Sequence, residues 1–207
     1  MRRILLGLAV TALTVLAFAG PASAASGQVT KFRFHGTFAD AFWSTSSTLT
    51  SLSVSKAKQG SVLIVDQFTV NTDVNGVITG ATDTSADVTS GFSFAIHQPL
   101  ASASTSASGL PATACTFDAN FNLIGCSPTT IDLTATWTGQ GPIVREVAND
   151  HIKIDGASET DHFNGTARTA TATGTVAGLT LGESDPEGTD LGVTNAGTIS
   201  RCIGLSC

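Results

Sequence analysis

Apolar and polar side chains alternate along most of this chain, and this two-residue period constrains its fold more than any other feature. In Thr130–Thr138, for example, Ile131, Leu133, Ala135 and Trp137 alternate with threonines and one aspartate. Because successive side chains of a strand point to opposite faces, the pattern predicts half-buried β-strands. The same period recurs in residues 29–35, 37–44, 88–97, 151–155 and 163–176. After residue 24 no helical period is sustained, so we expect an all-β fold.

The spacing of these strands narrows the fold class further. Short strands at regular intervals, separated by turn residues, are typical of barrels and sandwiches. One long strand carries small residues at Ala167, Ala170, Ala172 and Gly174, which suits tight curvature where large inward side chains do not fit. We therefore predict a single antiparallel β-barrel or strongly curled sheet, with a β-sandwich as the alternative.

The first 24 residues have the three parts of a secretory signal peptide. Arg2 and Arg3 precede an uncharged apolar run, residues 4–20, and Ala22-Ser23-Ala24 supplies the small residues of a cleavage site. We expect residues 1–24 to be removed, the mature protein to be secreted, and no membrane-spanning segment to remain. Residues 25–207 are expected to form a single all-β domain in which the Ser- and Ala-rich residues 101–109 form a flexible loop.

The charge of the mature chain argues against several classes of partner. Loss of Arg2 and Arg3 leaves eight basic and 16 acidic residues, so the formal net charge changes from −6 to −8. DNA, RNA and anionic membranes all require a basic patch. The sequence therefore disfavours nucleic acid. The partner stays unknown, and a small-molecule or cell-envelope ligand is one candidate.

Four cysteines remain in the exported chain: Cys115, Cys126, Cys202 and Cys207. An even count in an oxidising compartment predicts disulfides, and three connectivities are open. The spacing favours Cys115–Cys126 across a hairpin that turns near residues 119–122, and Cys202–Cys207 at the C-terminus. Metal binding and redox catalysis are disfavoured because no Cys-x-x-Cys pair is present.

Two segments carry oxygen ligands in spacings that calcium uses. In residues 71–78, Asp73 and Asn75 precede a glycine, but the twelfth position is Thr82 rather than a glutamate. The Asn-Gly pair between apolar strands favours a hairpin turn. The second segment groups four carboxylates, among them Asp185, Glu187 and Asp190, and we interpret it as a solvated acidic loop. No cofactor is therefore expected.

A barrel would offer an interior site, and a hydrolase would need a catalytic group. The residues expected to line a ligand cavity are Phe32, Phe34, Phe92, Phe94 and Trp137, although ordinary core packing is the favoured interpretation of all five. A histidine and carboxylate pair involving His151 or His162 is the corresponding hypothesis for a hydrolase. No Gly-x-Ser-x-Gly or His-Glu-x-x-His motif supports it.

The C-terminal third carries two stretches, Asp132–Pro142 and His162–Val176. Together they resemble a group of small secreted proteins of actinobacteria. The resemblance implies export, an all-β domain and a Gram-positive source, and it assigns no catalytic residues. The chain departs from that pattern by the inserted Ala135 and Thr136.

Arg168 lies in the second stretch, where we expect it to pair with a carboxylate such as Asp132. The sequence as a whole predicts a non-catalytic extracellular protein, acting by binding or as a structural component of the envelope. A secreted hydrolase is the alternative.

Overall fold

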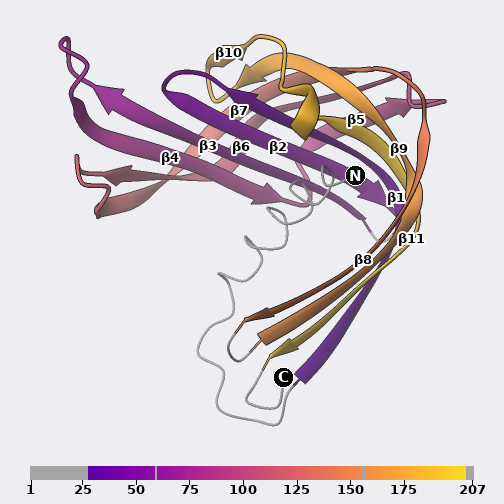
Figure 1. The fold of residues 1–207 in the computed structure, drawn as a ribbon. Coiled ribbons are helices and arrows are strands. Elements are labelled where there is room, and N and C mark those ends of the chain that lie inside the picture. The colour runs from indigo at the N-terminus through magenta and orange to yellow at the C-terminus, as the bar shows by residue number, and fades with distance from the viewer. Residues whose placement is uncertain (1–27, 59, 155–156, 204–207) are drawn as a thin grey trace.

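The computed structural model describes residues 28–58, 60–154 and 157–203, and within them eleven strands form one antiparallel sheet (Figure 1). The predicted signal peptide and Cys207 lie outside these residues. The strands are β1 (Gln28–Ser44), β2 (Thr48–Ala57), β3 (Gly60–Thr72), β4 (Ile78–Val88), β5 (Phe92–His97), β6 (Ser102–Phe117), β7 (Leu123–Gly139), β8 (Val144–Ile154), β9 (Ala157–Val176), β10 (Leu179–Leu181) and β11 (Asp190–Ile203). The prediction of an all-β fold is confirmed.

Hydrogen bonding closes eight of these strands into a ring. The sheet runs β9-β11-β1-β2-β3-β4-β6, and β7 then pairs with both β6 and β9. Three of the described strands lie outside the ring. Strand β5 pairs with β6, and both β8 and β10 pair with β9. The predicted strongly curled antiparallel sheet is thus confirmed. No helix in the described part of the chain is long and apolar enough to cross a membrane.

Strand β9 is long enough to serve two parts of the molecule. Its last residues, from Ala170 to Val176, pair with β7 and complete the ring, whereas the residues before them pair with β8 and β11. As a result β1, β11, β9 and β8 continue beyond the ring as a four-stranded extension, which runs downward in Figure 1.

The interior of the ring is packed with side chains from all sides. Trp137 on β7 is fully buried and Trp43 on β1 is nearly so. Each indole N–H is satisfied by a backbone carbonyl: Trp137 Nε1 donates to Asp40 O over 2.9 Å, and Trp43 Nε1 donates to Gly182 O over 3.0 Å. Apolar burial of this kind is the main stabilising term of such a domain.

Small residues allow β9 to approach its neighbours closely at the closure of the ring. Ala170 and Ala172 are fully buried in the core. Gly174 lies opposite Ala135, and a Cβ added there would overlap the carbonyl oxygen of Thr134. Three of the four small residues singled out in the sequence, Ala170, Ala172 and Gly174, thus lie where β9 pairs with β7 and closes the ring.

The Ser- and Ala-rich residues 101–109 are not the flexible loop that was expected. Residues 102–109 form the first half of β6 and pair with both β5 and β7. Ala103 and Thr105 face the core, so the segment keeps the two-residue period despite its low complexity. Small side chains fit here because the strand lies between two others.

Asp132 and Arg168 do not pair as expected. Asp132 accepts hydrogen bonds from Gly109 N (2.7 Å) and Ser108 Oγ (2.8 Å), at the point where the register between β6 and β7 shifts. These two bonds lower the pKa of Asp132, Gly109 having the larger effect. Arg168 instead donates from Nε to Gly141 O (3.0 Å) and from Nη1 to a second backbone carbonyl.

Candidate functional site

Two hairpin loops lie side by side at one end of the ring. The first, residues 73–77, connects β3 to β4, and the second, residues 118–122, connects β6 to β7. Strand β4 pairs with β6 so that Ala81 lies opposite Phe117, which brings the two loops to the same end. We call loops 73–77 and 118–122 and their neighbouring strand residues the hairpin end. The strand residues are Leu49, Asp66, Phe68, Ile78, Asp83, Phe117, Leu123 and Ile124.

The β3–β4 loop is the hairpin turn that Asn75-Gly76 predicts. Asp73 Oδ1 accepts hydrogen bonds from Asn75 N (2.8 Å) and Val77 N (2.9 Å), and Asp73 N donates to Val77 O (2.9 Å). Gly76 has a positive φ of 79°, which glycine tolerates without a steric penalty. The two backbone donors, Val77 first, lower the pKa of Asp73. Its carboxylate therefore organises the turn.

The β6–β7 loop repeats this arrangement. Asp118 Oδ1 accepts hydrogen bonds from Asn120 N (2.8 Å) and Asn122 N (2.9 Å), and Asp118 N donates to Asn122 O (3.0 Å). Hydrogen bonds from Asn122, through its side chain first, lower the pKa of Asp118. Both hairpins are thus held by an Asp-x-Asn motif, Asp73-x-Asn75 in the first and Asp118-x-Asn120 in the second. The sequence predicted both turns but not this shared motif.

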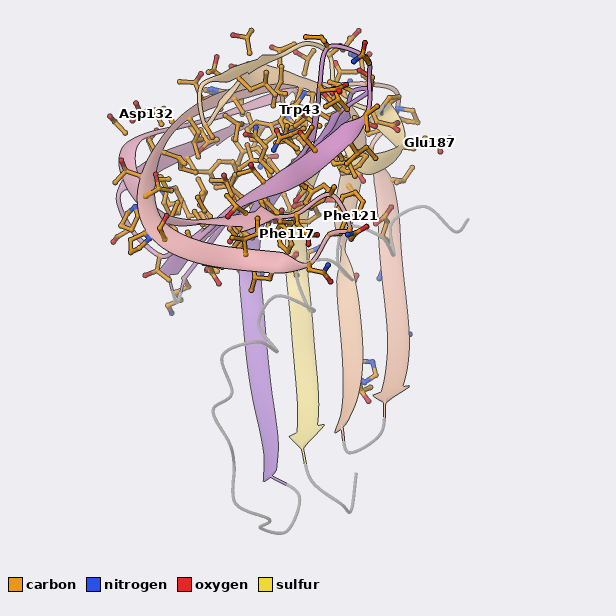
Figure 2. All side chains as sticks on the ribbon, turned by 90° about the vertical axis from the view of Figure 1, so that its left-hand side faces the viewer. Trp43, Phe117, Phe121, Asp132 and Glu187 are labelled. Carbon is orange, nitrogen blue, oxygen red and sulfur yellow. A yellow bond between two sulfur atoms is a disulfide. The ribbon has the colours of Figure 1, made fainter. Side chains whose placement is uncertain are left out.

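The two loops differ at the position that requires a positive φ. Where the first loop has Gly76, the second has Phe121, with φ of 62°. A bulky residue in this left-handed region costs roughly 1–3 kcal/mol. The ring of Phe121 lies 6.3 Å from that of Phe68, and Phe68 lies equally far from Phe117. Figure 2 shows Phe117 and Phe121 together on one rim of the ring, away from Trp43.

Large apolar side chains are exposed around these two loops. Val74 is fully exposed and Ile124 is 70% exposed. The other exposed members of the group are Leu49, Val77, Ile78, Phe121 and Leu123. Leu49 on β2 belongs to the group because it lies opposite Phe68 on β3. Exposed apolar side chains that gather at one end of a domain, unlike singly scattered ones, are a signal of an interaction site.

Two aspartates lie next to the aromatic side chains. Asp83 on β4 lies opposite Phe68 on β3, and Asp66 lies two residues before Phe68 on the same strand. Burial, the charge of Asp83 and a hydrogen bond to Asp83 raise the pKa of Asp66 to about 6. Asp83 Oδ1 is shielded from solvent and has no hydrogen-bond donor within the part of the chain that the structure describes. Hydrogen-bond donors therefore do not fully offset the negative charge of these two aspartates.

The charge around the hairpin end has one sign. From Gly60 to Gly139, which covers strands β3 to β7, the sequence contains six aspartates and no Lys, Arg or Glu. This run is visible in the sequence alone and was missed, because net charge was considered only for the whole chain. Four of the six, Asp66, Asp73, Asp83 and Asp118, lie in the two loops or beside Phe68, and they place negative charge at the hairpin end.

The predicted disulfide between Cys115 and Cys126 is confirmed. The two residues lie opposite each other on β6 and β7 with their Cα atoms 4.0 Å apart, and the bridge closes the hairpin that carries Phe121. The turn contains one register shift, so Phe117 pairs with Leu123 rather than with residue 124. The pairing of Cys202 with Cys207 lies outside the described residues.

Of the five residues proposed to line a cavity, the structure describes the side chains of three. Trp137 is a fully buried core residue. Phe92 and Phe94 on β5 are half-buried and pack against the core. The side chains of Phe32 and Phe34 lie outside the described part of the structure. A ligand cavity lined by these residues stays a prediction.

The acidic segment 183–190 packs against the sheet rather than being fully solvated. Asp185 caps a 3-10 helix (Pro186–Gly188) by accepting from Glu187 N over 2.8 Å, and Asp185 N donates to Phe42 O. Asp190 belongs to β11 and lies opposite Asp40 on β1. Within the described ranges no three His, Cys, Asp or Glu side chains are grouped as a metal site would require.

Two histidine rings contact amide or carbonyl oxygens, and one of them is that of His162 from the hydrolase hypothesis. His162 Nδ1 lies 2.6 Å from Asn149 Oδ1, and His35 Nδ1 lies 2.8 Å from Asn195 O. The side chain of His151 is not among those described. The hydrolase hypothesis therefore gains no specific support from these contacts.

Comparison with protein-family models, with curated proteins and with solved structures finds no match to this chain.

Proposed function

We propose that this chain is an exported, non-catalytic binding protein, and that the hairpin end is its binding surface. The observation that carries the proposal is Phe121, an aromatic residue kept in a backbone conformation that costs stability while its ring stays 47% exposed. The neighbouring loop has Gly76 at the same position. A backbone strain retained at an exposed aromatic side chain is typical of a functional position.

The geometry of the loops supports this proposal. Each loop is fixed by hydrogen bonds to Asp73 or Asp118, and Cys115–Cys126 closes the second hairpin. Binding costs less conformational entropy when the contacting side chains are held in place beforehand. Export, inferred from residues 1–24, is part of the same proposal, and a disulfide fits an oxidising compartment.

The proposal is tested by NMR titration of the ¹⁵N-labelled mature protein with the uncharged peptide Ac-Leu-Ser-Leu-Ser-Leu-NH₂. We expect the amide shifts to concentrate at loops 73–77 and 118–122. The double variant Val74→Ser/Ile124→Ser removes the two most exposed apolar side chains of the hairpin end and should abolish the shifts.

Val147→Ser is the matched control, because Val147 is also exposed but lies on β8 in the extension. This variant should bind the peptide as the wild type does. Shifts spread over the whole sheet, or retained in the double variant, would refute the proposed surface.

A further inference from the structure

We infer that the partner of the hairpin end is a cationic apolar segment of another protein, in which Lys or Arg side chains flank aliphatic or aromatic ones. The inference rests on the proposed function and identifies the class of ligand for that surface. It follows from three features of the hairpin end: the sign of its charge, the position of Asp66 and Asp83, and the shape of its apolar surface.

The negative charge of segment 60–139 favours a positively charged partner. Segment 60–139 carries six aspartates and no Lys or Arg, so the apolar side chains of the two loops lie in a negative field without a countercharge on strands β3 to β7. Complementary charge suppresses wrong partners and accelerates association with the right one. An anionic segment would be repelled by the same field.

Asp66 and Asp83 give the cation a defined position. They lie beside Phe68, whose ring contacts the rings of Phe117 and Phe121. Asp66 and Asp83 are both half-buried, so part of each remains open to a partner, and only the Oδ1 atom of Asp83 is shielded from solvent. An ammonium or guanidinium group that approaches Asp66 would also lie close to aromatic rings, which attract cations.

The form of the surface favours a protein segment over other apolar ligands. Val74 is fully exposed and Ile124 is 70% exposed. Sites for small molecules, in contrast, are concave and enclose the ligand. Hydrogen bonds lower the pKa of both loop carboxylates, from the Val77 backbone first at Asp73 and from the Asn122 side chain first at Asp118. Charged groups enter hydrocarbon at high cost, which disfavours a lipid surface. A symmetric dimer through this end would bring negative charge against negative charge.

Three peptides separate the charge preference from apolar binding: Ac-Leu-Lys-Leu-Lys-Leu-NH₂, Ac-Leu-Ser-Leu-Ser-Leu-NH₂ and Ac-Leu-Glu-Leu-Glu-Leu-NH₂. We expect the lysine peptide to bind at the hairpin end with a Kd about tenfold lower than that of the serine peptide, and the glutamate peptide to bind most weakly. Raising the salt concentration should weaken binding of the lysine peptide and leave the affinity of the serine peptide nearly unchanged.

The double variant Asp66→Asn/Asp83→Asn should remove most of the preference for the lysine peptide, because it removes the carboxylate pair while preserving side-chain size. Asp87→Asn is the control, since Asp87 lies on β4 opposite Ile64, away from the aromatic rings. It should retain the preference of the wild type.

The outcomes distinguish the two proposals. Equal binding of all three peptides at the hairpin end, or a lysine preference that persists in the double variant, would overturn the inference and leave the binding surface intact. Failure of all three peptides to bind would overturn the proposed surface itself.

Discussion

Acidification should stabilise this protein, and Asp40 is a principal reason. Asp40 lies on β1 between Asp190 on β11 and Ser53 on β2. Burial is the larger cause that raises its pKa from 3.8 to about 6, the charge of Asp190 also raises it, and a hydrogen bond from Ser53 opposes both. An acid with a higher pKa in the folded state binds its proton more tightly there. Its contribution to stability is therefore complete below pH 3.8 and is lost as the pH rises through 6.

The size of the effect follows from the shift. One pKa unit corresponds to about 1.4 kcal/mol, and a shift from 3.8 to about 6 makes the folded protein about 1.4 kcal/mol more stable at pH 5 than at pH 8. Asp40 is partly exposed, and screening by solvent reduces this to about 1 kcal/mol. The pKa of Asp190 is also raised to about 6, by burial, so it contributes in the same direction.

The assay is urea unfolding of the mature protein between pH 5 and pH 8, for the wild type and for Asp40→Asn. The asparagine is of equal size and leaves the backbone carbonyl that Trp137 contacts in place. The whole shift from 3.8 to about 6 corresponds to about 3 kcal/mol, and screening reduces it. We therefore expect the variant to gain about 2 kcal/mol at pH 8 and to show a smaller dependence on pH. A wild type that becomes more stable as the pH rises from 5 to 8, or a variant with an unchanged slope, would refute the reasoning.

Three further perturbations test the packing of the ring. Replacing Cys115 and Cys126 with alanine should lower the free energy of unfolding by about 3 kcal/mol, measured with urea, because the bridge closes a short loop of the unfolded chain; an unchanged midpoint would contradict this. Gly174→Ala should destabilise strongly because its Cβ would overlap backbone, whereas the control Gly125→Ala has open space and should change the melting temperature little. Trp137→Phe should cost about 1–3 kcal/mol in the same unfolding assay, since it leaves a buried carbonyl without its donor; a neutral effect would show that this hydrogen bond is not formed.

The strands could be predicted because their signal is local. On β7, Ile131, Leu133, Ala135 and Trp137 are buried and the residues between them are exposed, as the alternation requires. The Cys115–Cys126 bridge was predictable for the same reason, since both cysteines belong to one hairpin. The run of small residues in β9 is likewise local, and it predicted tight curvature of that strand.

Other parts depend on contacts that are distant in sequence. The hairpin end exists because β4 pairs with β6, and β5 (Phe92–His97) lies between them in the chain. No local pattern gives that pairing. Residues 102–109 were mistaken for a loop because low complexity was given more weight than the inward positions of Ala103 and Thr105. The strained φ of Phe121 is a backbone property that its sequence neighbours do not reveal.

The hairpin end is proposed to be a surface that is held in place before any partner binds. NMR spectra of the unliganded mature protein with labelled phenylalanine rings test it most directly. The claim predicts nuclear Overhauser cross-peaks from Phe68 to both Phe117 and Phe121, whose ring centroids each lie 6.3 Å from that of Phe68. A Phe121 ring without such cross-peaks, together with random-coil shifts for residues 118–122, would contradict it.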